Sequence, residues 1–160
     1  MSGGLRVWRG GPSDLDAAVR LFQGYLDFYG KDHPPENSRA FVQARLENGD
    51  SRIFLAAIDD RAVGFTQLYP AFASLSLAPS WILNDLFVNS TARGQGVGEA
   101  LMQAARDLAV DTAAAEIFLQ TARDNESAQR LYRRLGYQRD DEFLVYTLGM
   151  APPRPLPKGY

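Results

Sequence analysis

The sequence predicts an α/β fold in one domain, with a central, mostly antiparallel sheet that contains one parallel strand pair and is flanked by helices. Its 160 residues match the usual length of a single domain. Hydrophobic residues make up 46% and charged residues 22%, which are globular values and exclude a disordered chain. Helical spacing and strand-like runs follow one another as helices, a hairpin and then β-α-β-α-β, an order typical of a mixed α/β sheet.

Two helices are predicted near the N-terminus. Residues 14–30 place apolar side chains at helical spacing after Ser13, which suits an N-cap. A shorter helix is expected at residues 37–48, with Asn37 or Ser38 as its cap. The first helix carries a second apolar face, formed by Leu21, Tyr25 and Phe28. This face should therefore meet something besides the helix's own core.

Strands are predicted from short runs rich in β-branched and aromatic residues. Residues 52–58 and 61–69 form such runs on either side of Asp59-Asp60, which favours an antiparallel hairpin. Residues 80–88 (SWILNDLFV) predict a third strand, because a proline precedes the run and an Asn-Ser pair follows it.

The C-terminal half is expected to alternate helix and strand. Helices are predicted at residues 94–111 and 125–135, and strands at residues 116–122, 137–139 and 142–148. Residues 1–150 are therefore predicted to form the single domain. Residues 151–160 are rich in proline and predict a C-terminal tail.

Charge and residue counts exclude several classes of function. The net charge is −2 and the charges are scattered, so neither nucleic acid nor a membrane surface is expected as a partner. The lack of cysteine and the single histidine, His33, exclude thiol nucleophiles, Cys/His zinc sites and nearly every Ser/His/Asp scheme, and no metal is expected. Because no apolar run suits a signal peptide or a membrane span, the protein is expected to be cytoplasmic.

A glycine-rich turn between the third strand and the next helix carries the clearest chemical signal. Gly94, Gly96 and Gly98 allow close backbone approach, and the N–H groups and dipole of the following helix favour an anion. Arg93 adds a positive charge. The dinucleotide fingerprint fails because Glu99 replaces its third glycine, and the Walker A loop fails because its Gly-Lys-Ser/Thr is missing. A turn that is glycine-rich for structural reasons alone is the remaining alternative.

Three segments match, in order, the motifs of one known family. Residues 93–98 (RGQGVG) fit the pattern Gln/Arg-x-x-Gly-x-Gly/Ala. Residues 85–88 (DLFV) resemble the central strand of that family, and residues 125–137 (NESAQRLYRRLGY) resemble its later helix. The chain thus resembles the GNAT superfamily of acetyl-CoA-dependent N-acetyltransferases, and the resemblance extends over roughly residues 5–148.

The resemblance implies acetyl-CoA as co-substrate and a set of cofactor-binding residues. The central strand would splay from its parallel neighbour at a bulge, with the backbone N–H of Val88 facing the thioester carbonyl as an oxyanion donor. Asn125 would hold the pantetheine, and Tyr132 would give its proton to the departing thiolate. The implied cofactor-binding residues are Phe87, Val88, Arg93, Gly94, Gln95, Gly96, Val97, Gly98, Asn125 and Tyr132.

The acceptor implied by the resemblance is a primary amine on a small molecule. The aromatic motif of residues 21–29 and the strand of residues 81–88 look most like acetyltransferases of polyamines, diamines and small amino compounds. Asn84 stands where those enzymes often carry a Glu that helps to deprotonate the amine. The implied substrate-binding residues are Tyr25, Phe28, Tyr29, Asn84 and Asp85, and the candidate proton acceptors are Asp85, Glu36, Asp32 and His33.

Two other functions stay open at this point. A protein or peptide acetyltransferase would use the same cofactor motif with an open groove. A non-catalytic acyl-CoA-binding regulatory module would keep the cofactor site without turnover, although Tyr132 argues against it. The aromatic side chains of the first helix would equally suit the interface of a homodimer, which the resemblance also favours.

Overall fold

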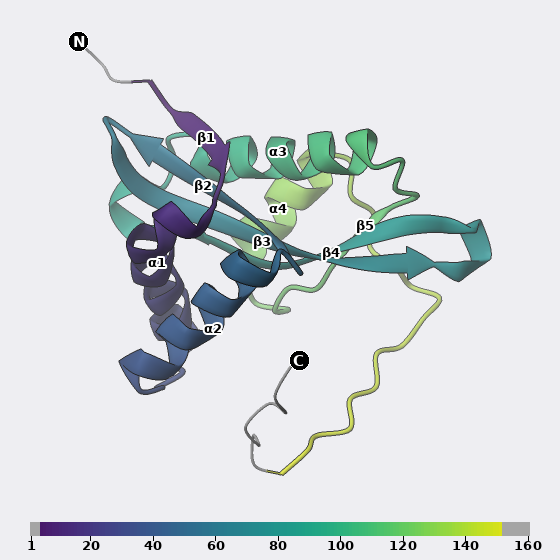
Figure 1. The fold of residues 1–160 in the computed structure, drawn as a ribbon. Helices are drawn as coiled ribbons and strands as arrows, with labels where there is room; N and C mark the ends of the chain where they lie inside the picture. The colour runs from purple at the N-terminus through teal and green to yellow at the C-terminus, as the bar shows by residue number, and fades with distance from the viewer. Residues whose placement is uncertain (1–3, 152–160) are drawn as a thin grey trace. The chain divides into compact units, whose positions relative to one another are not determined.

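The computed structural model describes residues 4–151, which belong to two compact units divided after Ala122 (Figure 1). The first unit contains β1 (Arg6–Arg9), α1 (Leu15–Phe28), α2 (Pro35–Asn48), β2 (Arg52–Ile58), β3 (Arg61–Ala73), β4 (Ala78–Val88), α3 (Val97–Asp111) and β5 (Ile117–Leu119). Short 3₁₀ turns lie at Pro12–Asp14, Ser74–Ser76 and Ser90–Ala92. The described part of the second unit contains α4 (Glu126–Arg134).

The five strands form one sheet in the order β1-β2-β3-β4-β5. The first three pairings are antiparallel, and β4 pairs with β5 in parallel. This arrangement confirms the predicted mixed sheet with one parallel pair. The N-terminal strand β1 was not predicted, because its four residues, RVWR, are too few to show a periodic pattern.

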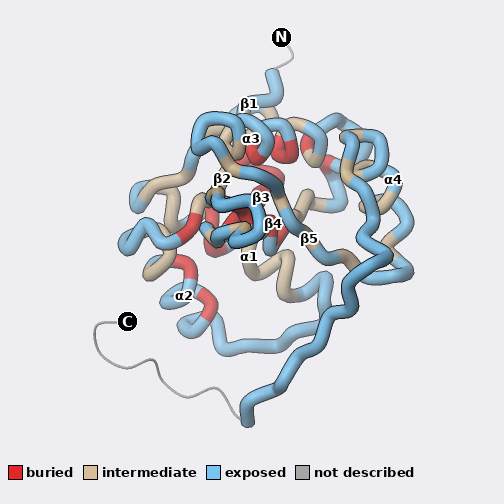
Figure 2. The backbone as a smooth tube through the Cα atoms, turned by 90° about the vertical axis from the view of Figure 1, so that its right-hand side faces the viewer, coloured by how far each residue is buried: buried red, intermediate tan, exposed pale blue. Residues whose placement is uncertain are grey.

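The two faces of the sheet are covered by different helices (Figure 1). Helices α1 and α2 pack on one face, over a core that includes Leu21, Val42 and Phe65. Helix α3 packs on the other face, where Val97 and Leu101 are buried against strand residues. Figure 2 shows the buried positions concentrated in the strands and in the helix faces turned toward them. The sheet is therefore a shared layer between two separate apolar clusters.

The predicted helix starts differ from those observed. Ser13 lies within a 3₁₀ turn, and Asp14 occupies the N-cap position of α1 instead. Helix α2 begins at Pro35, because proline suits the first helical position. Asn37 and Ser38 therefore lie inside the helix, and the buried Ser38 hydroxyl donates to the carbonyl of Pro35 at 3.0 Å.

A close backbone approach in the sheet depends on Gly64 of β3. A Cβ atom at this position would lie 2.9 Å from the carbonyl oxygen of Phe87 and 3.0 Å from a methyl of Val97. We expect Gly64→Ala to lower the free energy of unfolding by about 1–3 kcal/mol, since neither a backbone oxygen nor a buried core side chain yields easily. Chemical denaturation measures this change. Gly11→Ala is the control, because a Cβ there meets nothing within 4 Å, and an equal loss in both variants would contradict the packing argument.

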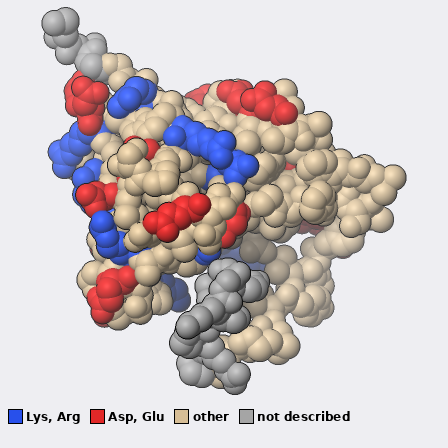
Figure 3. Space-filling view, in the orientation of Figure 1, with Lys and Arg blue, Asp and Glu red and all other residues tan. Residues whose placement is uncertain are grey.

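Strands β3 and β4 continue into an apolar arm, defined here as residues 70–79. No charged residue lies between Arg61 and Asp85 in the sequence, and the projecting end of the arm carries no Lys, Arg, Asp or Glu in Figure 3. The tip exposes Phe72, Leu75 and Leu77, whose relative exposures are 82%, 99% and 94%. A patch of large apolar side chains at full exposure is typical of an interaction surface.

The described part of the second unit corrects one prediction. Helix α4 confirms the helix expected at residues 125–135. The strands predicted at residues 137–139 and 142–148 are wrong, because residues 137–150 have no strand assignment. The side chain of Asp140 instead accepts two backbone N–H groups at the start of the second segment, which forms a local turn. A strand-like composition alone does not create a strand without a partner for its backbone.

The prediction of one domain over residues 1–150 with a tail at residues 151–160 stays a prediction, and residues 152–160 lie outside the described part of the chain. Within residues 4–151, no helix is both long enough and apolar enough to cross a membrane.

Candidate functional site

The end of strand β4 has an open edge on the side of β5. Pairing between β4 and β5 stops at Leu83 opposite Leu119, so within the described sheet residues 84–88 have no strand neighbour on that side. The pairing with β3 shifts at the same place, because Gln67 lies opposite Asp85 and the next β3 residue lies opposite Leu83. Asn84 is thus the extra residue of a β-bulge. The parallel pair opens where the sequence resemblance implies that it should.

The backbone N–H of Val88 faces this open edge. The next residue, Asn89, donates its N–H to the carbonyl of Val63 in β3 at 2.8 Å. Successive N–H groups of a strand point to opposite edges, so the N–H of Val88 points away from β3. A carbonyl oxygen placed along this edge would meet a donor that is already oriented.

The glycine-rich turn leads directly from this edge into helix α3. Gly94 and Gly96 adopt positive φ angles of 77° and 81°, which glycine adopts without strain. Gly96 is the N-cap of α3 and supplies no side-chain cap. The first backbone N–H groups of the helix, at Val97 and Gly98, have no partner within it, and they form a donor set at the positive end of its dipole. The side chain of Val97 is buried in the core, so only its backbone can reach a ligand.

The two polar side chains of the turn make local contacts. Arg93 donates from Nε to the carbonyl of Val88 at 3.3 Å, and its guanidinium carbon lies 5.6 Å from the ring centre of Phe28. Gln95 donates to the carbonyl of Thr91 at 3.2 Å. Arg93 therefore connects the end of β4 with the end of α1 and places a positive charge beside the open edge.

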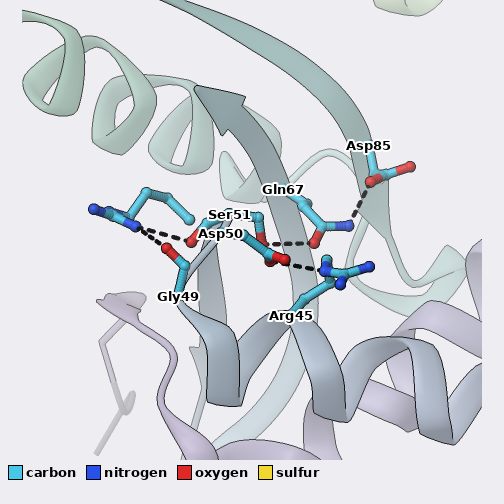
Figure 4. A network of polar contacts seen from close by, with 7 residues as sticks. Arg45, Gly49, Asp50, Ser51, Gln67 and Asp85 are labelled. Carbon is cyan, nitrogen blue, oxygen red and sulfur yellow. Dashed lines mark hydrogen bonds and ion pairs between the residues drawn. The ribbon is translucent and has the colours of Figure 1, made fainter. Parts of the chain in front are cut away.

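Asp85 lies at the end of a buried chain of hydrogen bonds that runs from Ser51 through Gln67 (Figure 4). The residue is 4% exposed, and its carboxylate accepts from Nε2 of Gln67 at 2.8 Å and from Nδ2 of Asn84 at 3.1 Å. Ser51 donates to the other end of the Gln67 amide at 2.9 Å, so the amide nitrogen must face Asp85. The Thr66 hydroxyl donates to the backbone carbonyl of Asp85 at 2.8 Å.

Two tyrosines lie close to this carboxylate. Burial raises the pKa of Tyr25 above its ordinary value, and the charge of the nearby Asp85 raises it further. Burial, with a further contribution from Asp85, raises the pKa of Tyr69 to about 12. Both phenols are therefore held in their protonated form at neutral pH.

The predicted aromatic residues at the end of α1 form a series of ring contacts, with Tyr29 between Tyr25 and Phe28. The ring of Tyr29 lies 5.0 Å from the Tyr25 ring and 5.2 Å from the Phe28 ring, and Phe28 and Tyr29 are both exposed. Gly24 brings the helix close to β4, because a Cβ there would lie 2.9 Å from the ring of Phe87. The Phe87 side chain consequently packs in the core under α1, and only its backbone is at the open edge.

The other candidate proton acceptors lie elsewhere. Asp32, His33 and Glu36 are all exposed in the segment that precedes α2 and in its first turn. Exposure to solvent is sufficient to account for polar side chains at these positions. Asp85 is the only buried Asp or Glu among residues 4–151, and it is the one adjacent to the bulge.

Asn125 and Tyr132 belong to the second unit. Asn125 is the N-cap of α4 and accepts from the N–H of Ala128 at 3.3 Å, so helix capping already accounts for its side-chain oxygen. Tyr132 follows seven residues later and therefore lies on the same face of the helix, about 10 Å along the axis. Its ring centre is 5.9 Å from that of Tyr137.

Sequence reasoning missed Ser51, Gln67 and Tyr69. Gln67 carried a usable signal, since it is a long polar residue in the apolar strand segment AVGFTQL. A buried polar side chain in such a run needs a hydrogen-bond partner, and Asp85 is that partner. Ser51 precedes its strand and gave no pattern to detect.

The family model described as the acetyltransferase (GNAT) family matches residues 18–137 of this chain, a range that includes the opened strand, the glycine-rich turn and Tyr132. The chain belongs to the GNAT family. As members of that family do, this GNAT protein acts as an acetyl-CoA-dependent acyltransferase.

Individual relatives agree with the family assignment. An uncharacterized N-acetyltransferase of Bacillus subtilis, YhfO, is 42% identical over 138 residues, which cover 86% of this chain and 93% of the relative. A D-amino-acid N-acetyltransferase of Saccharomyces cerevisiae is 26% identical over 81% of this chain and 82% of its own length. The crystal structure of a probable acetyltransferase superposes with a TM-score of 0.86 at 42% identity, over 92% of this chain and 99% of that one. The GNAT fold is thereby shown for this protein.

Proposed function

We propose that this GNAT acetyltransferase transfers the acetyl group of acetyl-CoA to a primary amine of a small, cationic molecule. The observation that carries the proposal is the buried carboxylate of Asp85, which lies beside the bulge of β4 and near Tyr25 of α1. A carboxylate and ring faces together favour a bound ammonium group. Polyamines, diamines and amino-acid-like amines all present such a group.

The cofactor is proposed to lie along the open edge of β4. The pantetheine arm would pair with the backbone near Phe87 and Val88 in the place that a sixth strand would take. The pyrophosphate would sit on the backbone N–H groups of the turn from Arg93 to Gly98, where two glycines have positive φ and the dipole of α3 favours an anion. The thioester oxygen would then accept the N–H of Val88.

The chemistry is proposed to be direct attack of the amine on the thioester carbonyl. Only a neutral amine carries the lone pair needed for attack, so the bound ammonium must first lose a proton, which Asp85 would accept directly or through a water molecule. As the C–S bond breaks, Tyr132 would give its proton to the departing thiolate, because a phenol with a reference pKa near 10 is protonated at neutral pH. Asn125, at the start of the same helix, would hold the pantetheine.

The finer choice of acceptor depends on Asn84. Its amide donates to Asp85 at 3.1 Å, so it serves as a hydrogen-bond donor to the carboxylate and supplies no second negative charge. One carboxylate suits a single ammonium group better than a long polycation. An amino-acid-like amine or a short diamine is therefore favoured, and the D-amino-acid N-acetyltransferase among the relatives points in the same direction.

An acceptor panel tests this proposal. The purified protein is mixed with acetyl-CoA and polyamines, diamines, D- and L-amino acids, aminoglycosides or short peptides, and thiol release and product mass are recorded. The lack of cysteine keeps the thiol background low. The proposal requires acceptor-dependent release and a small amine product that is heavier by one acetyl group. Acetylation of the peptides alone would replace it with a protein acetyltransferase, and acetyl-CoA binding without release would leave a binding module.

We further propose that the protein is a homodimer joined through the apolar arm. The arm is uncharged and exposes Leu75 and Leu77, and a two-fold axis brings such a patch onto its own copy. We expect the wild type to have twice the chain mass by light scattering and Leu75→Glu to shift it toward the monomer, because a charge would be buried in the interface. Val110→Glu, at an exposed position of α3, is the matched control. A monomeric wild type, or an unchanged dimer in Leu75→Glu, would exclude the arm as the interface.

A further inference from the structure

The two carboxylate oxygens of Asp85 have different partners. Gln67 of β3 donates from Nε2 to Oδ2 at 2.8 Å, and Asn84, the extra residue of the bulge, donates from Nδ2 to Oδ1 at 3.1 Å. Gln67 is 1% exposed, whereas Asn84 is exposed. Oδ2 is therefore bound by a group that solvent does not reach, and Oδ1 by a group that solvent does reach.

This asymmetry divides the work between the two oxygens. An ionised carboxylate offers about four lone-pair sites, so two donors leave about two of them open. An amine that arrives from solvent reaches Asp85 beside the exposed Asn84, which is the side of Oδ1. When a proton binds Oδ1, Oδ2 becomes the carbonyl oxygen of the neutral acid, and a carbonyl oxygen still accepts from Gln67. The Gln67 contact thus suits both protonation states of Asp85 without rearrangement.

Gln67 is itself held in place. It lies directly opposite Asp85 in the pairing of β3 with β4, and the Ser51 hydroxyl donates to its Oε1 at 2.9 Å (Figure 4). Thr66 holds the backbone carbonyl of Asp85 at 2.8 Å. Ser51, Thr66 and Gln67 are all buried, so none of them meets the acceptor from solvent. An apolar side chain of similar size would also fill the position of Gln67, so what the amide adds is the hydrogen bond to Asp85.

We infer that Gln67 is a positioning residue that anchors Oδ2 of Asp85, so that the proton of the acceptor ammonium passes to Oδ1. This inference rests on the proposed acetyl transfer to an amine with Asp85 as the proton acceptor. One N–H bond of the ammonium breaks, and its proton goes to Oδ1 directly or through a water molecule. The electron pair left on nitrogen then forms the C–N bond to the thioester carbonyl. Ser51 acts one step further back, by completing the hydrogen bonds of the Gln67 amide.

The test compares acceptors that do and do not need deprotonation. Wild type and Gln67→Met are assayed with an alkylamine, which is an ammonium at pH 7, and with methoxyamine, whose nitrogen is neutral at that pH. Methionine has a similar length and no donor. We expect kcat for the alkylamine to fall by about 10- to 10²-fold, because the carboxylate loses its anchor, and kcat for methoxyamine to fall by a much smaller factor. The KM for acetyl-CoA should not change.

A matched control and a milder variant accompany this test. Gln23→Met removes another Gln–Ser hydrogen bond, from Gln23 to Ser38 at 3.4 Å, and should keep the wild-type kcat with both acceptors. Ser51→Ala leaves Oε1 of Gln67 without its donor and should show the same selective loss for the alkylamine, to a smaller extent. Ser51→Thr keeps the hydroxyl and should retain most of the wild-type kcat. Thermal unfolding shows whether each variant is folded.

A double variant provides a second readout. If Gln67 acts through Asp85, adding Gln67→Met to Asp85→Asn lowers kcat for the alkylamine no further. Multiplied losses would show independent roles and overturn the inference. An equal loss of kcat with both acceptors, or no loss in Gln67→Met, would also overturn it, while the proposed function would still stand on the wild-type activity. A wild type that acetylates no amine would overturn the proposed function, and the inference with it.

Discussion

Replacing Tyr132 by phenylalanine is expected to lower kcat by about 10²- to 10⁴-fold while the affinity for acetyl-CoA changes little. The phenol is the proposed acid for the departing thiolate, and its loss leaves that charge without a proton. Tyr132 lies on α4 with its ring 5.9 Å from the Tyr137 ring, and a phenylalanine keeps this contact. Steady-state thiol release gives kcat, and calorimetric titration with acetyl-CoA gives the affinity.

The control for this prediction is Tyr146→Phe, which removes a phenol from an exposed position in the same unit. It should keep the wild-type kcat. A Tyr132→Phe enzyme that turns over at the wild-type rate would remove Tyr132 from the chemistry. A variant that loses acetyl-CoA affinity and kcat together would assign Tyr132 to binding instead of proton donation.

The second large effect is expected for Asp85→Asn, which should lower kcat/KM for ammonium acceptors by about 10²- to 10⁴-fold. The change removes both the proposed proton acceptor and the negative charge that attracts the ammonium. Affinity for acetyl-CoA should persist, because none of the proposed cofactor contacts involves the Asp85 side chain: they are the backbone at Val88, the turn before α3 and Asn125. The kinetics are measured with the best acceptor of the panel and again with methoxyamine, for which kcat/KM should fall far less because its nitrogen is already neutral at pH 7.

The fold is expected to tolerate this substitution. An asparagine places an amide nitrogen where Gln67 or Asn84 now donates, so one of these amides must turn over. If Gln67 turns, its nitrogen faces Ser51, whose hydroxyl can accept instead of donating. Asp16→Asn, at an exposed ion pair with Arg39, is the matched control. Wild-type kcat/KM in Asp85→Asn, at an unchanged unfolding temperature, would show that another group takes the proton.

The sequence was informative where a local pattern determines local structure. Residues 93–98 predicted a glycine turn before a helix, and positive φ angles at Gly94 and Gly96 explain why glycine is needed there. The hairpin around Asp59-Asp60 and the helix ending before Gly49 were also found, because left-handed turn residues mark both places.

Features that depend on contacts distant in sequence were harder to predict. Gln67 and Asp85 meet only because β3 and β4 pair across a bulge, and Ser51 joins them from the start of β2. Residues 142–148 were wrongly predicted as a strand, since β propensity describes how a side chain fits a sheet and cannot supply a partner. The short β1 becomes a strand through its pairing with β2.

The most direct test of the account is hydrogen–deuterium exchange with and without saturating acetyl-CoA. The account predicts that amide exchange slows in peptides covering residues 84–98, because the N–H of Val88 and the amides of the glycine-rich turn become bonded to the cofactor. Helix α2, on the acceptor side of the sheet, should change little. Protection elsewhere in the chain, with none at residues 84–98, would contradict the assignment of the open edge of β4 as the acetyl-CoA site.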